Sequence, residues 1–220
     1  MELVDIFGAA ASASSILCQL VGLQICVQIV RKGGTDLVSP VPFIAFFISA
    51  CLWMKYGLLQ NNSNLVLTNA AGAFLQLLYI FIFYSYTVKK SHFHRIIFFG
   101  MVILFMPLVY LRFARPDMNV GIFHLGVFCC AMSICCYISP MASVRDICRT
   151  KSTETMSFWL VLFNFVSAFC WVAYGTLLND PFVATPNFVG LLFGIIQISL
   201  FCIYPSSRHK LKTSTPVLNV

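Results

Sequence analysis

Two tryptophans and two asparagines occur at matching positions inside long apolar stretches. Trp53 and Trp171 are separated by 171 − 53 = 118 positions, and Asn69 and Asn187 by the same interval. An indole offers a flat apolar face and one N–H donor, whereas a carboxamide offers a donor and an acceptor. These groups suit a site for a small molecule with several hydroxyls, held between the two indoles. A structural role is the alternative, because tryptophans also anchor spans and asparagines also join helices in membranes.

The stretches that hold these residues are predicted to be transmembrane helices. Hydrophobic residues make up 60% of the 220-residue chain, and its mean hydropathy is +0.89. The apolar runs are long enough to cross a bilayer, which takes about 20 residues, and they lack the alternation of membrane strands. They begin near Ile6, Phe43, Leu65, Ile96, Ile122, Phe158 and Phe182. We therefore expect an all-α polytopic membrane protein with seven transmembrane helices.

The interval of 118 residues recurs along much of the chain, which indicates an internal duplication. It relates SACLWMKYG, which begins at Ser49, to SAFCWVAYG, which begins at Ser167. Further identical pairs at this interval are Arg31 and Arg149, Thr35 and Thr153, Tyr56 and Tyr174, Gly72 and Gly190, and Tyr86 and Tyr204. Each copy contains three spans, and the fourth span has no counterpart.

The expected plan is therefore two three-helix bundles joined by one linker helix. The first repeat is expected at 1–90, the linker at 91–118, the second repeat at 119–205 and a cytosolic tail at 206–220. Because three is an odd number, the single extra crossing gives both copies the same direction through the membrane. Two such parallel repeats are expected to hold a site between them near the midplane.

Positive charges gather in alternate loops, and this pattern predicts the orientation of the spans. They follow spans one, three, five and seven at Arg31, Lys32, Lys89, Lys90, Arg95, Arg145, Arg149, Lys151, Arg208, Lys210 and Lys212. Loops 60–64 and 179–181 have no basic residue, and only Arg112 and Arg115 depart from the pattern. We expect an outside N-terminus, a retained first helix and a cytosolic C-terminus. The basic residues lie mostly at the cytoplasmic ends of spans, and this placement alone explains the net charge of +7. No nucleic-acid partner is therefore expected.

Motifs in both copies resemble those of the SWEET (MtN3/saliva) sugar transporters, and those of the animal branch most closely. They are LWMKYG and LTNAAGA in the first copy, CWVAYG and NDPFVATPNFVG in the second, and YISPMA at the end of span five. The likeness extends to about Tyr204. It implies two bundles in the lipid bilayer that enclose a small neutral sugar and expose it to each side in turn. It also implies a location in the plasma membrane or the Golgi, and it leaves open a homo-oligomer.

The resemblance further implies roles for particular residues. Besides the tryptophans and asparagines, four small side chains are expected to line the substrate pocket: Cys18, Ser49, Cys136 and Ser167. Helix packing is the alternative role for these four. Gating residues are expected at Gly22, Pro42, Pro140 and Ser157 on the cytoplasmic side, and at Tyr56, Gly57, Gly126, Asp180 and Pro186 on the outer side. Gly22 and Ser157 stand where the family has prolines, and they restrict the backbone less than proline does.

Carboxylates are absent from the interior of the apolar runs. All Asp and Glu residues lie in expected loops or at span ends, whereas ion-coupled transporters need an ionisable group or a carbonyl cage within the membrane. We therefore expect passive, bidirectional transport of a neutral solute. The sequence also lacks the paired carboxylates or nucleophile and base of an enzyme, and its ten cysteines lack the spacing of a metal site. No enzyme activity, cofactor or metal is expected.

Two other classes of protein remain open at this point. A seven-helix receptor would share the expected orientation, although a receptor needs no repeat with paired Trp and Asn. A protein of the same three-plus-one-plus-three plan that carries another small solute, or that acts as a sorting receptor or scaffold, is the nearer alternative. The Pro-Gln pair typical of the amino-acid-exporting PQ-loop branch is absent from this sequence.

Overall fold

The protein is helical throughout the part that the structure, a computed structural model, describes. This part is residues 2–204 without 37, 115 and 155, and without the side chains at 138–140 and 142. Its helices are α1 (Leu3–Leu20), α2 (Gly22–Lys32), α3 (Val41–Leu59), α4 (Ser63–Tyr86), α5 (Lys90–Phe113), α6 (Met118–Cys136), α7 (Ile138–Thr150), α8 (Phe158–Leu177) and α9 (Pro181–Ile203). The expected tail at 206–220, with its three basic residues, lies outside the described residues, as does Arg115.

Seven of the helical segments are long and apolar enough to cross a membrane, which confirms the predicted number of spans. The first of them, Leu3–Lys32, consists of α1 and α2 together. The others are α3, α4, α5, α6, α8 and α9. Most begin a few residues before the apolar run itself, because backbone hydrogen bonding continues into the polar residues that flank each span.

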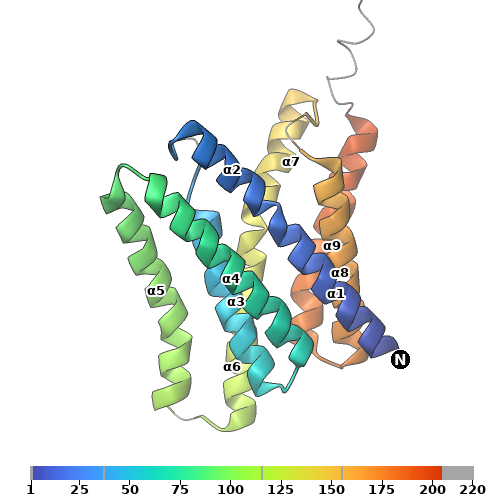
Figure 1. The fold of residues 1–220 in the computed structure, drawn as a ribbon. Helices are drawn as coiled ribbons and strands as arrows, with labels where there is room; N and C mark the ends of the chain where they lie inside the picture. Colours follow the sequence, from blue (N-terminus) through green and yellow to red (C-terminus); the bar gives the residue numbers. More distant parts are fainter. Residues whose placement is uncertain (1, 37, 115, 155, 205–220) are drawn as a thin grey trace, which may run out of the picture.

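The spans form two bundles with α5 between them in the chain. In the first bundle α3 packs against α4, and in the second α8 packs against α9 (Figure 1). The bundles meet where α1 contacts α8 and where α3 contacts α6. Helix α5 lies at the edge of the molecule, where its main contacts are with α3 (Figure 1). This arrangement is the predicted three-plus-one-plus-three plan.

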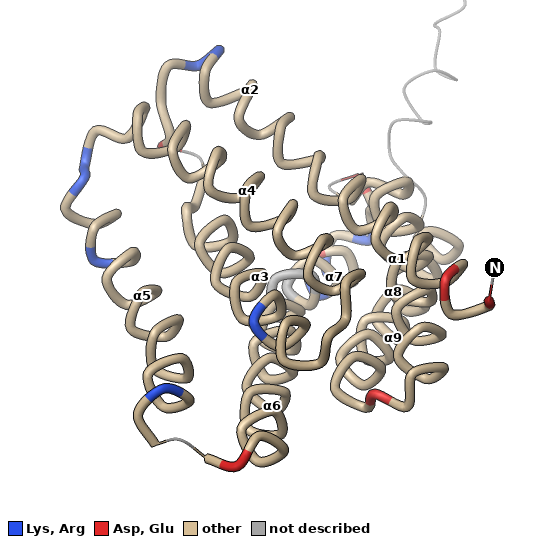
Figure 2. The backbone as a smooth tube through the Cα atoms, turned by 60° about the horizontal axis from the view of Figure 1, so that its bottom comes forward, with Lys and Arg blue, Asp and Glu red and all other residues tan. Residues whose placement is uncertain are grey.

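The two ends of the molecule differ in their turns and charges. The tight turns between α3 and α4 and between α8 and α9 lie at one end, which we call the hairpin end (Figure 1). Asn61 and Asn179 occupy these turns with φ of 53° and 54°, left-handed values that asparagine tolerates well. The other end, which we call the basic end, includes the ends of α2 and α7 and the start of α5. Figure 2 shows most Lys and Arg near the ends of helices.

The first span of each repeat is interrupted near the basic end. Val21 separates α1 from α2, and Tyr137 separates α6 from α7. Gly22 lies at the first break, where a Cβ atom would overlap the ring of Tyr79. The Tyr79 hydroxyl donates to the Gln19 carbonyl at 3.1 Å, so it satisfies a backbone acceptor beside the break.

The other expected hinge residues lie elsewhere. Pro42 is the second residue of α3, and Ser157 is the residue before α8. A proline in the first helical turn removes no helical hydrogen bond, so Pro42 does not interrupt its helix. Pro140 falls within α7, but its side chain is outside the described part of the chain.

Candidate functional site

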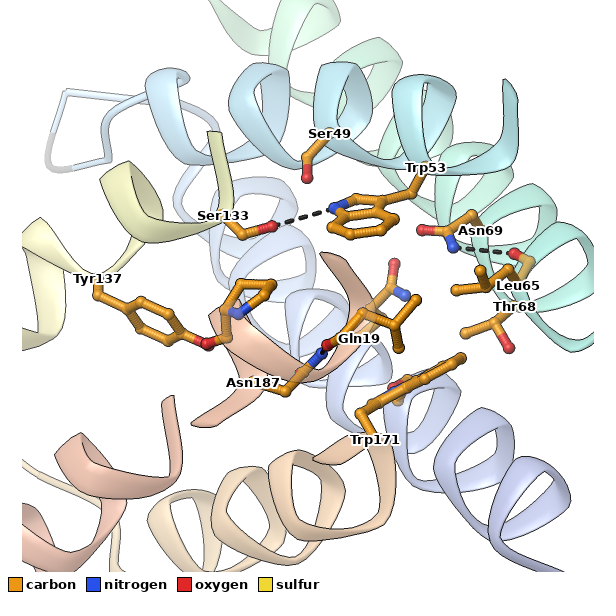
Figure 3. A pocket seen from close by; sticks show the side chains of 13 residues that line it. Gln19, Ser49, Trp53, Leu65, Thr68, Asn69, Ser133, Tyr137, Trp171 and Asn187 are labelled. Carbon is orange, nitrogen blue, oxygen red and sulfur yellow. Dashed lines mark hydrogen bonds between the residues drawn. The ribbon is translucent and has the colours of Figure 1, made fainter. Parts of the chain in front are cut away.

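A cavity of about 180 Å³ lies between the two repeats. Figure 3 shows Trp53 on one side of it and Trp171 on the other, with Asn69 beside Trp53 and Asn187 on the side of Trp171. The residues that line it are Ser15, Gln19, Ser49, Trp53, Leu65, Thr68, Asn69, Ser133, Tyr137, Trp171, Val183, Pro186 and Asn187. Both repeats therefore contribute to one site.

Matching elements position the two tryptophans. Trp53 lies six residues before the end of α3 at Leu59, and Trp171 lies six residues before the end of α8 at Leu177. Each indole meets the tyrosine three residues later nearly edge-on, with ring centroids 5.5 Å apart for Trp53 and 5.6 Å apart for Trp171. This packing fixes the plane of each indole beside the cavity.

The indole N–H groups bond across the boundary between the repeats. Trp53 Nε1 donates to Ser133 Oγ at 3.0 Å, and Trp171 Nε1 donates to Ser15 Oγ at 2.7 Å. Ser15 and Ser133 are themselves 118 positions apart, so each tryptophan bonds the serine of the other repeat. The sequence suggested that the indole N–H groups are free for a ligand; in the structure they hold the repeats together, and the indole faces remain for a ligand.

The two asparagines also have equivalent surroundings. Asn69 Nδ2 donates to the Leu65 carbonyl at 2.8 Å, and Asn187 Nδ2 donates to the Val183 carbonyl at 2.7 Å. Each of these bonds lies within one helix, and it orients the carboxamide. Neither side-chain oxygen accepts a hydrogen bond from another described residue. These oxygens are therefore acceptors available to a hydroxyl group in the cavity.

The four small residues expected in the pocket lie at different places. Ser49 lines the cavity, while Cys136 and Ser167 line a second cavity that adjoins it. Cys18 is half-buried and lines neither cavity. The physical reason is its place on α1, because the cavity faces Ser15 and Gln19, which lie one helical turn apart. Cys18 falls beside that line.

Several lining residues were not identified from the sequence. Gln19 and Tyr137 occupy equivalent positions in the two repeats. Tyr137 Oη donates to the Pro186 carbonyl at 3.3 Å. Pro186 has no N–H, so the Phe182 carbonyl one turn earlier has no helical donor; Cys130 Sγ lies 3.2 Å from it and donates instead. Pro186, expected in the outer gate, is fully buried and lines the cavity.

The hairpin end is closed by hydrogen bonds between the repeats. Tyr56 Oη donates to both carboxylate oxygens of Asp180, each at 3.0 Å. The equivalent bond has its donor in the second repeat and its acceptor in the first, and it runs from Tyr174 Oη to Asn62 Oδ1 at 2.8 Å. Asp180 Oδ1 also accepts from the backbone N–H groups of Phe182 and Val183 and so caps α9. All of these contacts lie on the hairpin side of the tryptophans.

Close helix packing accompanies this closure. A Cβ atom on Gly126 would lie 2.6 Å from the ring of Phe182, so α6 approaches α9 closely only because glycine is there. Gly126 acts within the second repeat, and Gly57 acts likewise within the first, where its Cβ would lie 2.9 Å from Leu65 Cβ. Gly57 therefore permits contact between α3 and α4, whereas the expected gate residues Tyr56 and Asp180 join the two repeats.

Toward the other end, the described residues of the two repeats are not joined in this way. Among the described residues, side-chain hydrogen bonds between the two repeats occur only from the hairpin end to the layer of the tryptophans, where Ser15 Oγ also lies 3.1 Å from Ser167 Oγ. The second cavity continues from this layer toward the basic end. The structure therefore represents a state that is closed at the hairpin end.

The residues that line both cavities are uncharged. Their polar groups are hydroxyls, carboxamides and a thiol. The described residues contain no group of three His, Cys, Asp or Glu side chains that could hold a metal ion. This arrangement can bind a neutral, hydroxylated solute by hydrogen bonds and by contact with the indole faces.

Comparisons with known proteins agree with this geometry. Residues 5–91 and 123–209 each match the family described as "Sugar efflux transporter for intercellular exchange". These two segments are again 118 positions apart. A sugar transporter SWEET1 from Drosophila pseudoobscura pseudoobscura is 33% identical over 93% of this chain and 91% of its own length. A sugar transporter SWEET1 from Mus musculus is 31% identical over 92% and 95%.

A plant relative and a solved structure extend these matches. The bidirectional sugar transporter SWEET10 of Arabidopsis thaliana is 30% identical over 94% of this chain and 73% of its own length. The structure of a eukaryotic SWEET transporter superimposes with a TM-score of 0.81 at 25% identity, over 91% of this chain and 98% of the other. The chain therefore belongs to the SWEET (MtN3/saliva) family.

Proposed function

We propose that this protein is a passive, bidirectional transporter of small neutral sugars. The observation that supports this most directly is the cavity between Trp53 and Trp171, with two carboxamide oxygens facing it. One face of a sugar ring presents C–H groups, which pack against an indole, and its hydroxyls donate to carboxamide oxygens. The names of the SWEET relatives describe sugar transport, in agreement with this chemistry.

Transport requires the cavity to open at each end in turn. Opening the hairpin end would break the bonds from Tyr56 to Asp180 and from Tyr174 to Asn62. Closing the basic end would bring the repeats together beyond the tryptophans. Parallel repeats are related by an axis along the membrane normal, so a tilt of one bundle against the other changes access at both ends. Among the described residues, no charged side chain lines either cavity, so no ion need travel with the sugar.

We propose that the hairpin end faces the outside or the Golgi lumen and that the basic end faces the cytosol. The basic residues at the ends of α2 and α7 support this orientation. The protein then acts at the plasma membrane or in the Golgi. A thiol-reactive, membrane-impermeant label should reach a cysteine at Ser63 in intact cells, and one at Lys90 only after permeabilisation.

The transport proposal is tested with radiolabelled sugars. The protein is expressed in cells without endogenous sugar uptake, and flux of glucose, fructose, galactose and sucrose is measured in both directions. We expect at least one of these sugars to move down its gradient either way, at a rate unchanged by a proton ionophore or by removing sodium. Accumulation against a gradient that depends on either ion would refute passive transport, and no flux of any sugar would refute the substrate class.

A further inference from the structure

The second cavity differs from the first because only one repeat builds most of it. It has a volume of about 320 Å³ and adjoins the tryptophan site. Apart from Phe46, the residues that line it and not the first cavity all come from the second repeat. The tryptophan site is symmetric, and the second cavity is not.

Differences at equivalent positions account for this asymmetry. Gly194 and Gln197 line the cavity in α9, and the residues 118 positions earlier are Gln76 and Tyr79 in α4. Gln76 is only 5% exposed and Tyr79 is fully buried, so their side chains occupy space within the first repeat. In the second repeat, Gly194 has no side chain and contacts the ring of Phe165, and Gln197 is only half-buried. The second repeat therefore leaves open a volume that the first repeat fills.

Two carboxamides lie in this cavity at the same depth. Asn164 is six residues after the start of α8 at Phe158, and Gln197 is six residues before the end of α9 at Ile203. Both of these helix ends lie at the basic end, so both carboxamides are about 9 Å along their helices from it. The position equivalent to Asn164 in the first repeat is Phe46, so this polar pair is a property of the second repeat alone.

Neither carboxamide has a hydrogen-bond partner within the described part of the chain. At this depth an unpaired polar group exposed to hydrocarbon is unfavourable, so Asn164 and Gln197 require water or a solute in the cavity that they line. The rings of Phe165 and Phe193 line the same cavity and offer apolar faces. Carboxamides beside aromatic faces are the same chemistry that the tryptophan site offers.

We propose that this cavity is a second sugar subsite, at which a sugar pauses between the tryptophan site and the basic end. The inference rests on the proposed function, since it assigns a second place to the same substrate. The carboxamides of Asn164 and Gln197 bind its hydroxyls, and Phe165 and Phe193 contact its C–H groups. Because the first repeat has no equivalent pair, the path on the basic side of the tryptophans is asymmetric.

A native cysteine reports on occupancy of this subsite. Cys136 lines the second cavity and not the first, whereas Cys148 and Cys202 are exposed and line neither cavity. The purified full chain is treated with N-ethylmaleimide at rising glucose or sucrose concentrations, and alkylation of each cysteine is followed by mass spectrometry. We expect both sugars to slow alkylation of Cys136 and to leave the two reference cysteines unchanged. If Cys136 reacts too slowly, Asn164→Cys places a reporter in the same cavity.

Two sets of variants separate the subsite from the tryptophan site. Trp53→Ala combined with Asn69→Ala disables the first site at residues that line it and not the second cavity, and sugar should still protect Cys136. Asn164→Leu combined with Gln197→Leu should raise the half-protecting sugar concentration about threefold to tenfold for each hydrogen bond lost. Where Asn164→Cys serves as the reporter, Asn164 is already replaced, so Gln197→Leu alone tests whether the half-protecting sugar concentration rises. Ile196→Leu, which changes an exposed residue beside Gln197, is the control and should change nothing.

The outcomes distinguish failure of the subsite from failure of the transport proposal. Protection that disappears when Trp53 and Asn69 are replaced, or that survives loss of the Asn164 and Gln197 carboxamides, would overturn the subsite. A wild-type protein that transports sugar but whose reporter cysteine is never protected would overturn the subsite and leave the proposed function intact. A wild-type protein that neither transports nor binds any sugar would overturn both.

Discussion

Removal of the Tyr56 hydroxyl should weaken closure of the hairpin end more than removal of the equivalent Tyr174 hydroxyl. Tyr56 donates to a carboxylate, Asp180, at 3.0 Å from each oxygen, whereas Tyr174 donates to an amide oxygen, that of Asn62, at 2.8 Å. All four side chains are buried, so solvent screens neither bond strongly. The pair therefore compares a charged with a neutral acceptor at equivalent positions of one protein.

The expected magnitudes follow from the two kinds of hydrogen bond. A bond to a charged acceptor contributes about 1.5 to 3 kcal/mol net, and a bond between neutral groups about 0.5 to 1.5 kcal/mol. Since 1.4 kcal/mol corresponds to about a factor of ten, Tyr56→Phe should lower the ratio of closed to open hairpin ends about tenfold to a hundredfold. Tyr174→Phe should lower it about twofold to tenfold. In both variants the caps of α4 and α9 keep their backbone hydrogen bonds.

Electron paramagnetic resonance can measure this ratio in the reconstituted protein. Nitroxides at Ser63 and Leu178, exposed residues on the two hairpins, give a distance distribution with a short, closed component. Asp180→Asn gives α9 the capping residue type that α4 has at Asn62. It should lower the ratio of closed to open hairpin ends by less than Tyr56→Phe does and by more than Tyr174→Phe does. Equal shifts for the two tyrosine variants, or no shift for Tyr56→Phe, would refute the role assigned to the charged bond.

Three further substitutions have defined outcomes. Ser133→Ala leaves the Trp53 N–H without its acceptor, and an unpaired buried donor costs about 1 to 3 kcal/mol. Sugar flux per surface molecule should therefore fall about fivefold or more, and unchanged flux would contradict this. Gly126→Ala should populate the open hairpin end in the nitroxide assay, because a Cβ would lie 2.6 Å from the ring of Phe182, which packs against Tyr56 of the first repeat; a distribution like the wild type would argue against close packing there. Lys151→Gly should raise the melting temperature, because Lys151 has a left-handed φ of 56°; Lys151→Ala keeps the strain and should not raise it.

The number of spans and their plan were predictable because both depend on strong, local signals. A membrane helix satisfies its own backbone hydrogen bonds and must have a minimum length, so each long apolar run specifies one span. The interval of 118 residues then identifies equivalent positions without any structure. For this reason Trp53, Asn69 and their partners in the second copy were placed in one site before the fold was known.

The contacts between the repeats were not predictable in the same way. Ser15 and Ser133 are equivalent by the same interval, yet an interval within the chain does not say which residue of the other repeat a side chain will meet. The direction of a helix face is equally hard to derive, since successive residues point about 100° apart. That difference separates Gln19, which lines the cavity, from Cys18, which does not.

The asymmetry of the site lies in the residues that differ between the copies. The helical spacing of Gly194 and Gln197, and of Gln76 and Tyr79 in the first copy, predicts a small and polar inward face in each repeat, but it does not predict that these unlike pairs leave different volumes. The closed state of the hairpin end was also beyond the sequence, because one sequence must support both states of a transporter. A small free-energy difference between packed arrangements decides which is populated.

In the proposed function Trp53 and Trp171 form two walls of one sugar site, and substitution of each by alanine measures what each wall contributes. Loss of either indole should remove about 1 to 3 kcal/mol of binding, and so lower flux per surface molecule about tenfold to a hundredfold. The double variant should lose less than the sum, because a sugar that has lost one wall no longer contacts the other properly. Trp159, which is 67% exposed and outside both cavities, is the matched control. Normal flux per molecule in Trp53→Ala and Trp171→Ala, or an equal loss in Trp159→Ala, would contradict the account.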